Sequence, residues 1–169
     1  MIDFNAPADH VAPLLLGGVV TMGGVSVRLT EVEAYLGAED EAAHTFRGRT
    51  PRNAAMFGPP GRLYVYLSYG IHLAGNIVCA PEGTGHGCLM RAGEVVAGVD
   101  LARERRGDVP FEKLASGPGN LGKALGRVLG VETDRRMLLY DTSANSKNTL
   151  PSARRTRPSH RCPGVSFTK

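Results

Sequence analysis

Two acidic side chains, Glu31 and Glu33, are the most telling residues of this sequence for chemistry. They lie near the end of residues 25–35, where apolar and polar residues alternate with the period of a β-strand. A regular strand directs every second side chain to one side. One face is therefore predicted to carry Val25, Val27, Leu29, Glu31, Glu33 and Tyr35. A carboxylate in line with a core face is costly unless it is paired or hydrogen-bonded.

Two interpretations of these glutamates stay open on the strand pattern alone. A β-bulge, or the end of the strand, could return both carboxylates to water, with an arginine as a partner. Alternatively, one carboxylate serves as a general base in a partly apolar pocket.

Four of the five tyrosines fall between the end of this strand and residue 69. Tyrosines stand at positions 35, 64, 66 and 69, and Tyr69 precedes Gly70 at a predicted hairpin turn. An aromatic side chain at a hairpin tip gains no burial. Tyr69 is thus either a core residue that the hairpin prediction misplaces, or a wedge that enters the base stack of a nucleic-acid duplex.

The elements that must position these residues follow from periodicity and from glycine and proline. We predict a short helix or core segment at 13–20, strands at 25–35, 63–67, 71–80 and 88–92, and helices at 94–106 and 121–129. Residues 37–61 are predicted to form a long loop with one helical turn, and periodicity is lost beyond residue 142. This order of elements favours an α+β domain around a mostly antiparallel sheet.

Composition limits the class of protein. A chain of 169 residues, 42% hydrophobic and 21% charged, fits one globular domain. The net charge of +4 is compatible with phosphate contacts. Three cysteines without CxxC spacing suit a reducing compartment. The apolar run 11–20 is too short to span a bilayer, and the N-terminus is no signal peptide, so we expect a soluble cytoplasmic protein.

Several strings in fixed order resemble the alkyladenine (3-methyladenine) DNA glycosylase family. They are Glu31-Val-Glu-Ala-Tyr-Leu-Gly37, Glu39-Asp-Glu-Ala-Ala-His44, Thr50-Pro-Arg-Asn53 with Met56-Phe57, Tyr64-Val-Tyr-Leu-Ser-Tyr-Gly70, Asn76, Leu89-Met-Arg-Ala92 and Ser116-Gly-Pro-Gly-Asn-Leu121. The resemblance runs from about Leu14 to about Leu125. It implies a single compact α+β domain with a mostly antiparallel curved sheet, flanking helices and a protruding β-hairpin.

The resemblance also implies roles for individual residues. Glu33 matches the general base that activates a water to attack C1′ of the deoxyribose. Arg91 matches the arginine that holds this water and a nearby phosphate. Tyr69 matches the residue that intercalates into the duplex.

The remaining matched residues form the implied pocket for the base. Tyr35, His44 and Tyr66 match the walls that sandwich a flipped base, with the His44 backbone at its edge. Asn76 matches the residue that discourages guanine by crowding its exocyclic amine.

The implied function is that of a monofunctional DNA glycosylase in base excision repair. It would excise alkylated or deaminated purines of the 3-methyladenine, hypoxanthine and ethenoadenine class by base flipping, without lyase activity. No metal or cofactor is expected. The expected partner is double-stranded DNA with damaged purines, bound by a monomer in the cytoplasm, near the nucleoid in a prokaryote, or in the nucleus of a eukaryote.

The C-terminal region departs from the family pattern. We therefore divide the chain into a glycosylase-like catalytic domain at 1–145 and an atypical tail at 146–169. Cys162-Pro163 precedes Gly164-Val-Ser166 where the family has an Arg-apolar pair, in a string whose main-chain carbonyl helps position the water. A catalytically impaired damage-binding protein of the same fold is the alternative that this departure raises.

Two further classes compete on local motifs. A metal hydrolase would use His86 and Cys88 with Cys79 or His72, but their spacing matches no established ligand pattern. A helix-hairpin-helix glycosylase/lyase would use the glycine turn of residues 117–123, with Lys123 as a Schiff base. The aromatic strands do not suit that all-helical class.

Overall fold

The computed structural model of the chain describes residues 2–126, 138–140 and 166–168. These residues form an α+β fold around one seven-stranded sheet of order β3-β4-β5-β2-β1-β7-β6. The strands are β1 (Val19–Met22), β2 (Val25–Tyr35), β3 (Leu63–Ser68), β4 (His72–Cys79), β5 (His86–Ala97), β6 (Leu138–Tyr140) and β7 (Ser166–Thr168). The helices are α1 (Ala8–Leu15), α2 (Val99–Arg106) and α3 (Pro118–Ala124), with 3₁₀ turns η1 (Gly37–Glu39), η2 (Ala54–Phe57) and η3 (Phe111–Lys113).

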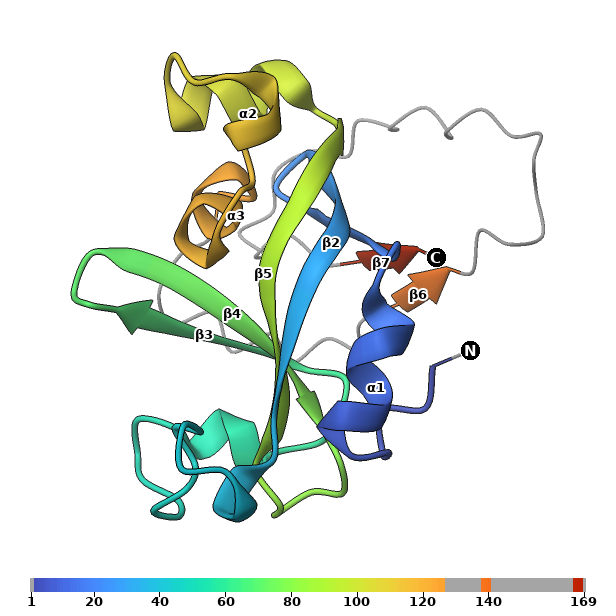
Figure 1. Ribbon diagram of the computed structural model, residues 1–169, viewed down its shortest axis with the longest axis vertical. Helices are drawn as coiled ribbons and strands as arrows, with labels where there is room; N and C mark the ends of the chain where they lie inside the picture. The colour runs from blue at the N-terminus through green and yellow to red at the C-terminus, as the bar shows by residue number, and fades with distance from the viewer. Residues whose placement is uncertain (1, 127–137, 141–165, 169) are drawn as a thin grey trace, which may run out of the picture.

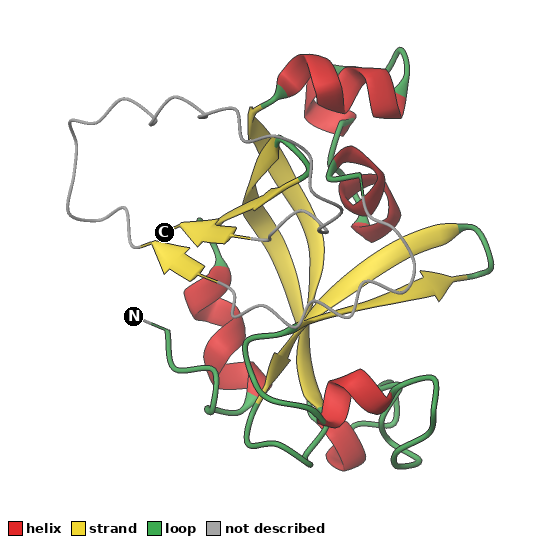
Figure 2. Cartoon of the chain, turned by 180° about the vertical axis from the view of Figure 1, so that it is seen from behind, coloured by secondary structure: helices red, strands yellow, loops and turns green. Residues whose placement is uncertain are grey.

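The predicted fold class is confirmed. Neighbouring strands are antiparallel throughout, except β6 and β7, which are parallel. The long strands β2 and β5 curve through the molecule, and β3 and β4 project from it as a hairpin (Figure 1). Seen from behind, the helices lie around the sheet and not in one layer (Figure 2). No helix within the described ranges has the length and apolar character needed to cross a membrane.

The tail predicted at 146–169 lies outside the described residues, apart from the strand β7. The end of the helix predicted at 121–129 also lies outside the described residues. The structure describes this region up to residue 126, with α3 followed by a turn.

The first helix lies earlier than predicted. It spans Ala8–Leu15, and its buried residues Ala8, Val11, Ala12 and Leu15 have the spacing of one helix face. Pro13 lies inside this short helix, where the sequence interpretation took it as the start. Residues 19 and 20, assigned to the same segment, belong to β1 (Val19–Met22), because they pair with β2.

The strand β5 is longer than predicted, and the helix after it is correspondingly shorter. Residues 94–97 pair with β2, with Glu94 opposite Arg28 and Val95 opposite Val27. Gly98, at φ +72° in the left-handed region, separates this strand from α2. A pairing with a distant strand thus overrides the helical spacing of Val95, Val99 and Ala102, on which the prediction rested.

The β2–β5 pair contains three register shifts, and the second and third, which compensate each other, decide which side chains face the core. Leu29 lies opposite Gly93 and Glu31 opposite Ala92, so β2 carries one extra residue, Thr30. Val32 then lies opposite Met90, so β5 carries one extra residue in turn, which is Arg91.

The bulge changes the phase of the strand. Before it, Val25, Val27 and Leu29 face the main core; after it, Val32 and Ala34 pack against that core instead. Glu31, Glu33 and Tyr35 therefore do not share the core face, and the prediction of one shared face was wrong. The bulge interpretation, with an arginine as the partner, describes the strand correctly.

Gly93 lies opposite Leu29, next to the extra residue of β2, and this provides a test of the close packing there. A methyl group at this position would overlap the carbonyl oxygen of Arg28 and a methyl of Val27. We expect Gly93→Ala to lower the free energy of unfolding by about 1–3 kcal/mol, the usual cost of overpacking. Chemical denaturation measures this loss. The neighbouring control, Glu94→Ala, removes an exposed side chain and should change stability by no more than about 1 kcal/mol.

Candidate functional site

One row of paired residues crosses four strands and carries the site. Tyr64 on β3 lies opposite Asn76 on β4, which lies opposite Leu89 on β5, which lies opposite Glu33 on β2. Directly opposed residues of antiparallel strands have side chains on the same face. Because of the bulge, this face is the one turned away from the main core and from α1.

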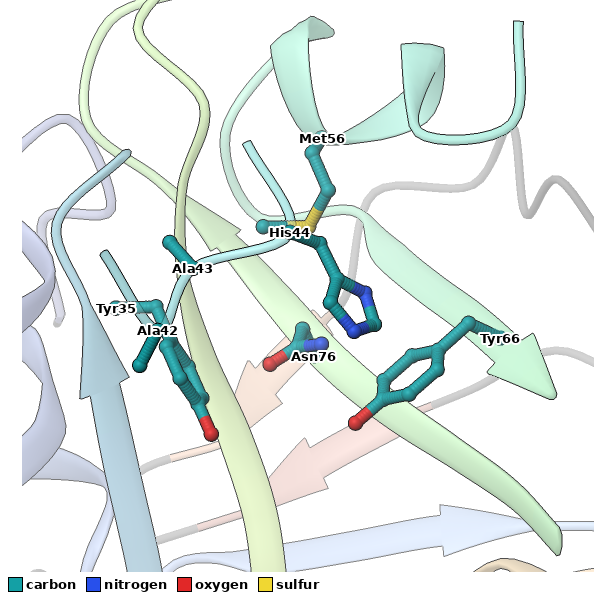
Figure 3. Close-up of a pocket in the computed structure, with 7 residues that line it drawn as sticks. All are labelled: Tyr35, Ala42, Ala43, His44, Met56, Tyr66 and Asn76. Carbon is teal, nitrogen blue, oxygen red and sulfur yellow. The ribbon is translucent and has the colours of Figure 1, made fainter. Parts of the chain in front are cut away.

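A small pocket lies on this face. It is lined by Tyr35, Ala42, Ala43, His44, Met56, Tyr66 and Asn76. Figure 3 shows Tyr35 and Tyr66 on opposite sides, with Asn76 between them and His44 above. The four residues predicted to bind a base therefore lie together around one pocket.

The pocket walls are formed by aromatic rings that contact one another. The rings of His44 and Tyr66 meet edge to face, with centroids 4.5 Å apart. Tyr66 also stacks on Tyr64, at 5.6 Å between centroids and 18° between planes. Burial raises the pKa of Tyr66 above its usual value, so its hydroxyl is protonated at neutral pH, as in an ordinary tyrosine. Such walls present π faces to a flat ring.

Asn53, a residue to which the sequence interpretation gave no role, holds the loop that carries His44. It is buried, and its amide nitrogen donates to the carbonyl oxygens of His44, at 2.9 Å, and of Gly48, at 3.1 Å. Its side-chain oxygen accepts from the backbone nitrogen of Thr50 at 2.7 Å. One amide thus organises a loop that has no strand or α-helix of its own.

Met56 is a second residue without a predicted role, and it forms part of the pocket lining. It comes from η2 and extends over β5 at Gly87, where an added methyl group would lie 2.6 Å from its terminal carbon. Gly87 pairs with Tyr35 on one side and Val78 on the other, so the missing side chain leaves room for Met56 in the same face of the sheet. Only the register of the strands, and not the local sequence, indicates that Met56 lines the pocket.

Beside the pocket, Arg91 joins two carboxylates. Its Nε donates to Oε1 of Glu31 at 2.9 Å, and its Nη1 donates to Oε2 of Glu33 at 2.6 Å. All three side chains are partly exposed. Glu33 and Arg91, predicted as catalytic residues, therefore lie in direct contact. The contact of Arg91 with Glu31 was not predicted.

Tyr35 connects the carboxylates to the pocket. Burial, the negative charge of Glu33 and a hydrogen bond to Glu33 raise the pKa of Tyr35 to about 12. The phenol is therefore protonated at neutral pH and donates to the carboxylate. A ring that lines the pocket thus also orients Glu33.

His44 is neutral at physiological pH. Burial, and to a smaller extent the positive charge of Arg52, lower the pKa of its imidazole below the usual 6.5. A neutral imidazole does not repel a positively charged ring in the pocket.

Asn76 has an unsatisfied group inside the pocket. The residue is only 4% exposed, and its side-chain oxygen has no hydrogen-bond partner within the described part of the chain. A buried acceptor without a partner costs about 1–3 kcal/mol. Such a group suits a site where a ligand completes the hydrogen bonding.

Tyr69 stands at the tip of the β3–β4 hairpin, as predicted, and it is 95% exposed. Tyr69 and Gly70 both have positive φ, at 50° and 74°, and the backbone nitrogen of Ile71 donates to the carbonyl of Ser68 at 3.1 Å. Both φ values lie in the left-handed region, and the backbone hydrogen bond closes the turn. The alternative of a misplaced core tyrosine is wrong, because the side chain lies in solvent.

The competing motifs do not assemble into sites. Within residues 2–126, 138–140 and 166–168, no three His, Cys, Asp or Glu side chains are placed to hold a metal ion. Cys79 and Cys88 are buried neighbours, with sulfur atoms 3.7 Å apart. The seven-stranded sheet rules out the all-helical class to which Lys123 and the glycine turn were compared.

Fold and site together define an α+β protein with an aromatic pocket for a flat ring next to an arginine-bound carboxylate. The chain belongs to the methylpurine-DNA glycosylase family, whose sequence model matches residues 2–156. The predicted family resemblance is thereby confirmed.

The chain is similar in sequence to proteins from three bacteria. The chain is 73% identical over 124 residues to a protein of Corynebacterium efficiens, a match that covers 73% of this chain and 65% of the relative. Identity is 68% over 126 residues with a Corynebacterium glutamicum protein (74% and 67% covered) and 56% over 125 residues with one of Frankia casuarinae (73% and 59% covered). Each is named "Putative 3-methyladenine DNA glycosylase". The match thus spans about two thirds of these relatives' length or less.

The lowered pKa of His44 predicts a contribution to acid sensitivity. Between this pKa and 6.5, the unfolded chain binds a proton at His44 that the folded protein does not bind. Stability is therefore lost as the pH falls below 6.5. We expect His44→Gln to show a smaller drop in melting temperature from pH 7.5 to pH 5 than the wild type. Equal drops in thermal unfolding would contradict this role for burial.

Proposed function

We propose that the protein is a monofunctional DNA glycosylase that removes alkylated or deaminated purines in base excision repair. The observation that carries this proposal is the arrangement of Glu33, bound to Arg91 and to Tyr35, at the edge of an aromatic pocket. Membership of the methylpurine-DNA glycosylase family supports it. The substrate is damaged duplex DNA, and the protein acts as a monomer.

Glu33 is the general base in the proposed reaction. It removes a proton from a water molecule, whose oxygen attacks C1′ of the deoxyribose as the bond from C1′ to the purine nitrogen breaks. The bonding electrons leave with the base. Arg91 holds the carboxylate, and its remaining N–H groups are available to a DNA phosphate. No residue forms a covalent intermediate, so the DNA strand stays intact.

The pocket favours electron-poor purines. A purine between Tyr35 and Tyr66 stacks on aromatic faces, and a positively charged alkylated ring gains cation–π attraction as well. Neutral His44 adds no opposing charge. Asn76, buried between the two tyrosines, crowds the base edge that carries the exocyclic amine of guanine, which disfavours that base.

Tyr69 serves as the wedge that holds open the space left by the flipped nucleotide. The hairpin presents this ring in solvent, on a turn fixed by a backbone hydrogen bond. Insertion into the stack replaces the contacts that the extruded base loses.

The reaction is tested by single-turnover release of hypoxanthine, ethenoadenine or 3-methyladenine from duplex DNA. We expect the wild type to release at least one of these bases, insensitive to EDTA and without strand cleavage. Glu33→Gln keeps the size of the side chain but removes the base, and it should slow release by at least about 100-fold.

Three outcomes of this assay contradict the proposal in different ways. Trapping of a protein–DNA adduct by borohydride would exclude the monofunctional mechanism. Full activity of Glu33→Gln would exclude Glu33 as the base. Lesion binding without release by the wild type would indicate the damage-binding alternative.

The wedge is tested by Tyr69→Ala. Loss of one aromatic stacking contact removes about 1–3 kcal/mol, so affinity for a lesion-containing duplex should fall by roughly 5- to 150-fold. Fluorescence anisotropy with duplex and single-stranded oligonucleotides measures this, and the duplex should be affected more. Leu14→Ala is the matched control, since Leu14 is an exposed apolar residue on α1, which packs on the core face. Equal affinities of wild type and Tyr69→Ala would remove this role.

A further inference from the structure

Glu31 holds the guanidinium of Arg91 from the side. It accepts from Nε at 2.9 Å, whereas Glu33 accepts from Nη1 at 2.6 Å. The N–H groups of Nη2 have no partner among the described residues. Two carboxylates therefore share one arginine, each through a different nitrogen.

This sharing affects which atoms of Glu33 remain available. An arginine facing one carboxylate tends to bind it through two parallel N–H···O bonds, which occupy both oxygens. Here the contact uses only Oε2 of Glu33. The bond from Nε to Glu31 keeps the guanidinium turned, so that Oε1 of Glu33 is not engaged by Arg91.

The strand irregularity is what brings the three side chains together. Glu31 directly follows the extra residue of β2, and Arg91 is itself the extra residue of β5. A regular ladder would place Arg91 within the pairing register, opposite a residue of β2. The arrangement thus depends on the same bulge that removes Glu33 from the core face.

The ion pair contributes little to the stability of the fold. The side chain of Glu31 is 57% exposed and that of Arg91 39% exposed. Exposed pairs of this kind are screened by water and have small net effects on folding. The consequence of the contact is therefore the orientation of the guanidinium.

We propose that Glu31 is a positioning residue for base removal: it fixes Arg91 so that the guanidinium engages only one oxygen of Glu33, which leaves the carboxylate an acceptor site for the attacking water beside the hydrogen bond from Tyr35. This inference rests on the proposed function, in which Glu33 activates that water. Glu31 touches neither the water nor the base, and it acts through Arg91.

A mutant series tests this in single-turnover base release. Glu31→Ala frees the guanidinium to engage both oxygens of Glu33, and we expect the maximal rate to fall about 10-fold with lesion affinity changed less than 2-fold. Glu31→Gln keeps an acceptor oxygen at the same distance along the side chain and should stay within 3-fold of the wild type. In an Arg91→Met background, Glu31→Ala should have no further effect.

Glu94→Ala is the matched control. Glu94 also lies on the β2–β5 pair, is 52% exposed and contacts an arginine, Arg28, at 3.6 Å. We expect wild-type rates for this variant. A Glu31→Ala protein with wild-type rates overturns the inference, and so does an equal loss in the Arg91→Met background. A wild type that releases no base overturns the proposed function and the catalytic part of the inference with it.

The hold of Glu31 on Arg91 has a readout that is independent of catalysis. In ¹⁵N-resolved NMR of the DNA-free protein, the Nε–H signal of Arg91 should exchange slowly with solvent. Glu31→Ala should abolish this protection, whereas Glu33→Gln should retain it. Unchanged protection in Glu31→Ala contradicts the inference whatever the activity of the protein.

Discussion

The pairing of β2 with β5 is the constraint on which the rest of the structure depends. Thr30 on β2 and Arg91 on β5 are both unpaired and offset each other, so the register recovers, but the faces of β2 are exchanged halfway along it. The first half contributes Val25, Val27 and Leu29 to the core, and the second half directs Glu33 away from it. In a regular strand, Glu33 would lie on the same face as Val25, Val27 and Leu29. Either the carboxylate would be buried or these core residues would be exposed. The bulge allows a single strand to serve both the core and a polar site.

Charge is distributed around the site in a consistent way. Tyr35 and His44, which line the pocket, are both neutral at physiological pH, because burial raises the pKa of the phenol and lowers that of the imidazole. The charges lie outside the pocket lining, where Arg91 is shared by two partly exposed carboxylates. A ring that enters the pocket thus meets π faces and dipoles, while charge is concentrated beside the pocket, at Glu31, Glu33 and Arg91.

The sequence predicts the local features of this protein better than its long-range ones. Residues 25–35 were predicted as a strand, and β2 has the same bounds, because alternation and glycine turns are local signals. The hairpin and the loop after β2 were recognised for the same reason. The prediction of helix at residues 94–97 was wrong. This segment is a strand because it pairs with β2, which is remote in sequence. Likewise, Tyr35, His44, Tyr66 and Asn76 were named through family resemblance and line one pocket. The phase change at Thr30, and the place of Met56, depend on register and could not be predicted.

In the proposed function, the turn at Tyr69 has a consequence for the kinetics of searching along DNA. Its backbone is already folded and hydrogen-bonded, so presenting the ring requires no ordering of a loop. Contact with undamaged duplex is then not delayed by a folding step at the tip, and encounters can be brief and numerous. The proposed function then places discrimination between normal and damaged sites after contact, at the stage where a nucleotide leaves the stack. With a preorganised tip, the rate at which DNA sites are contacted does not depend on how strictly damaged sites are distinguished from normal ones.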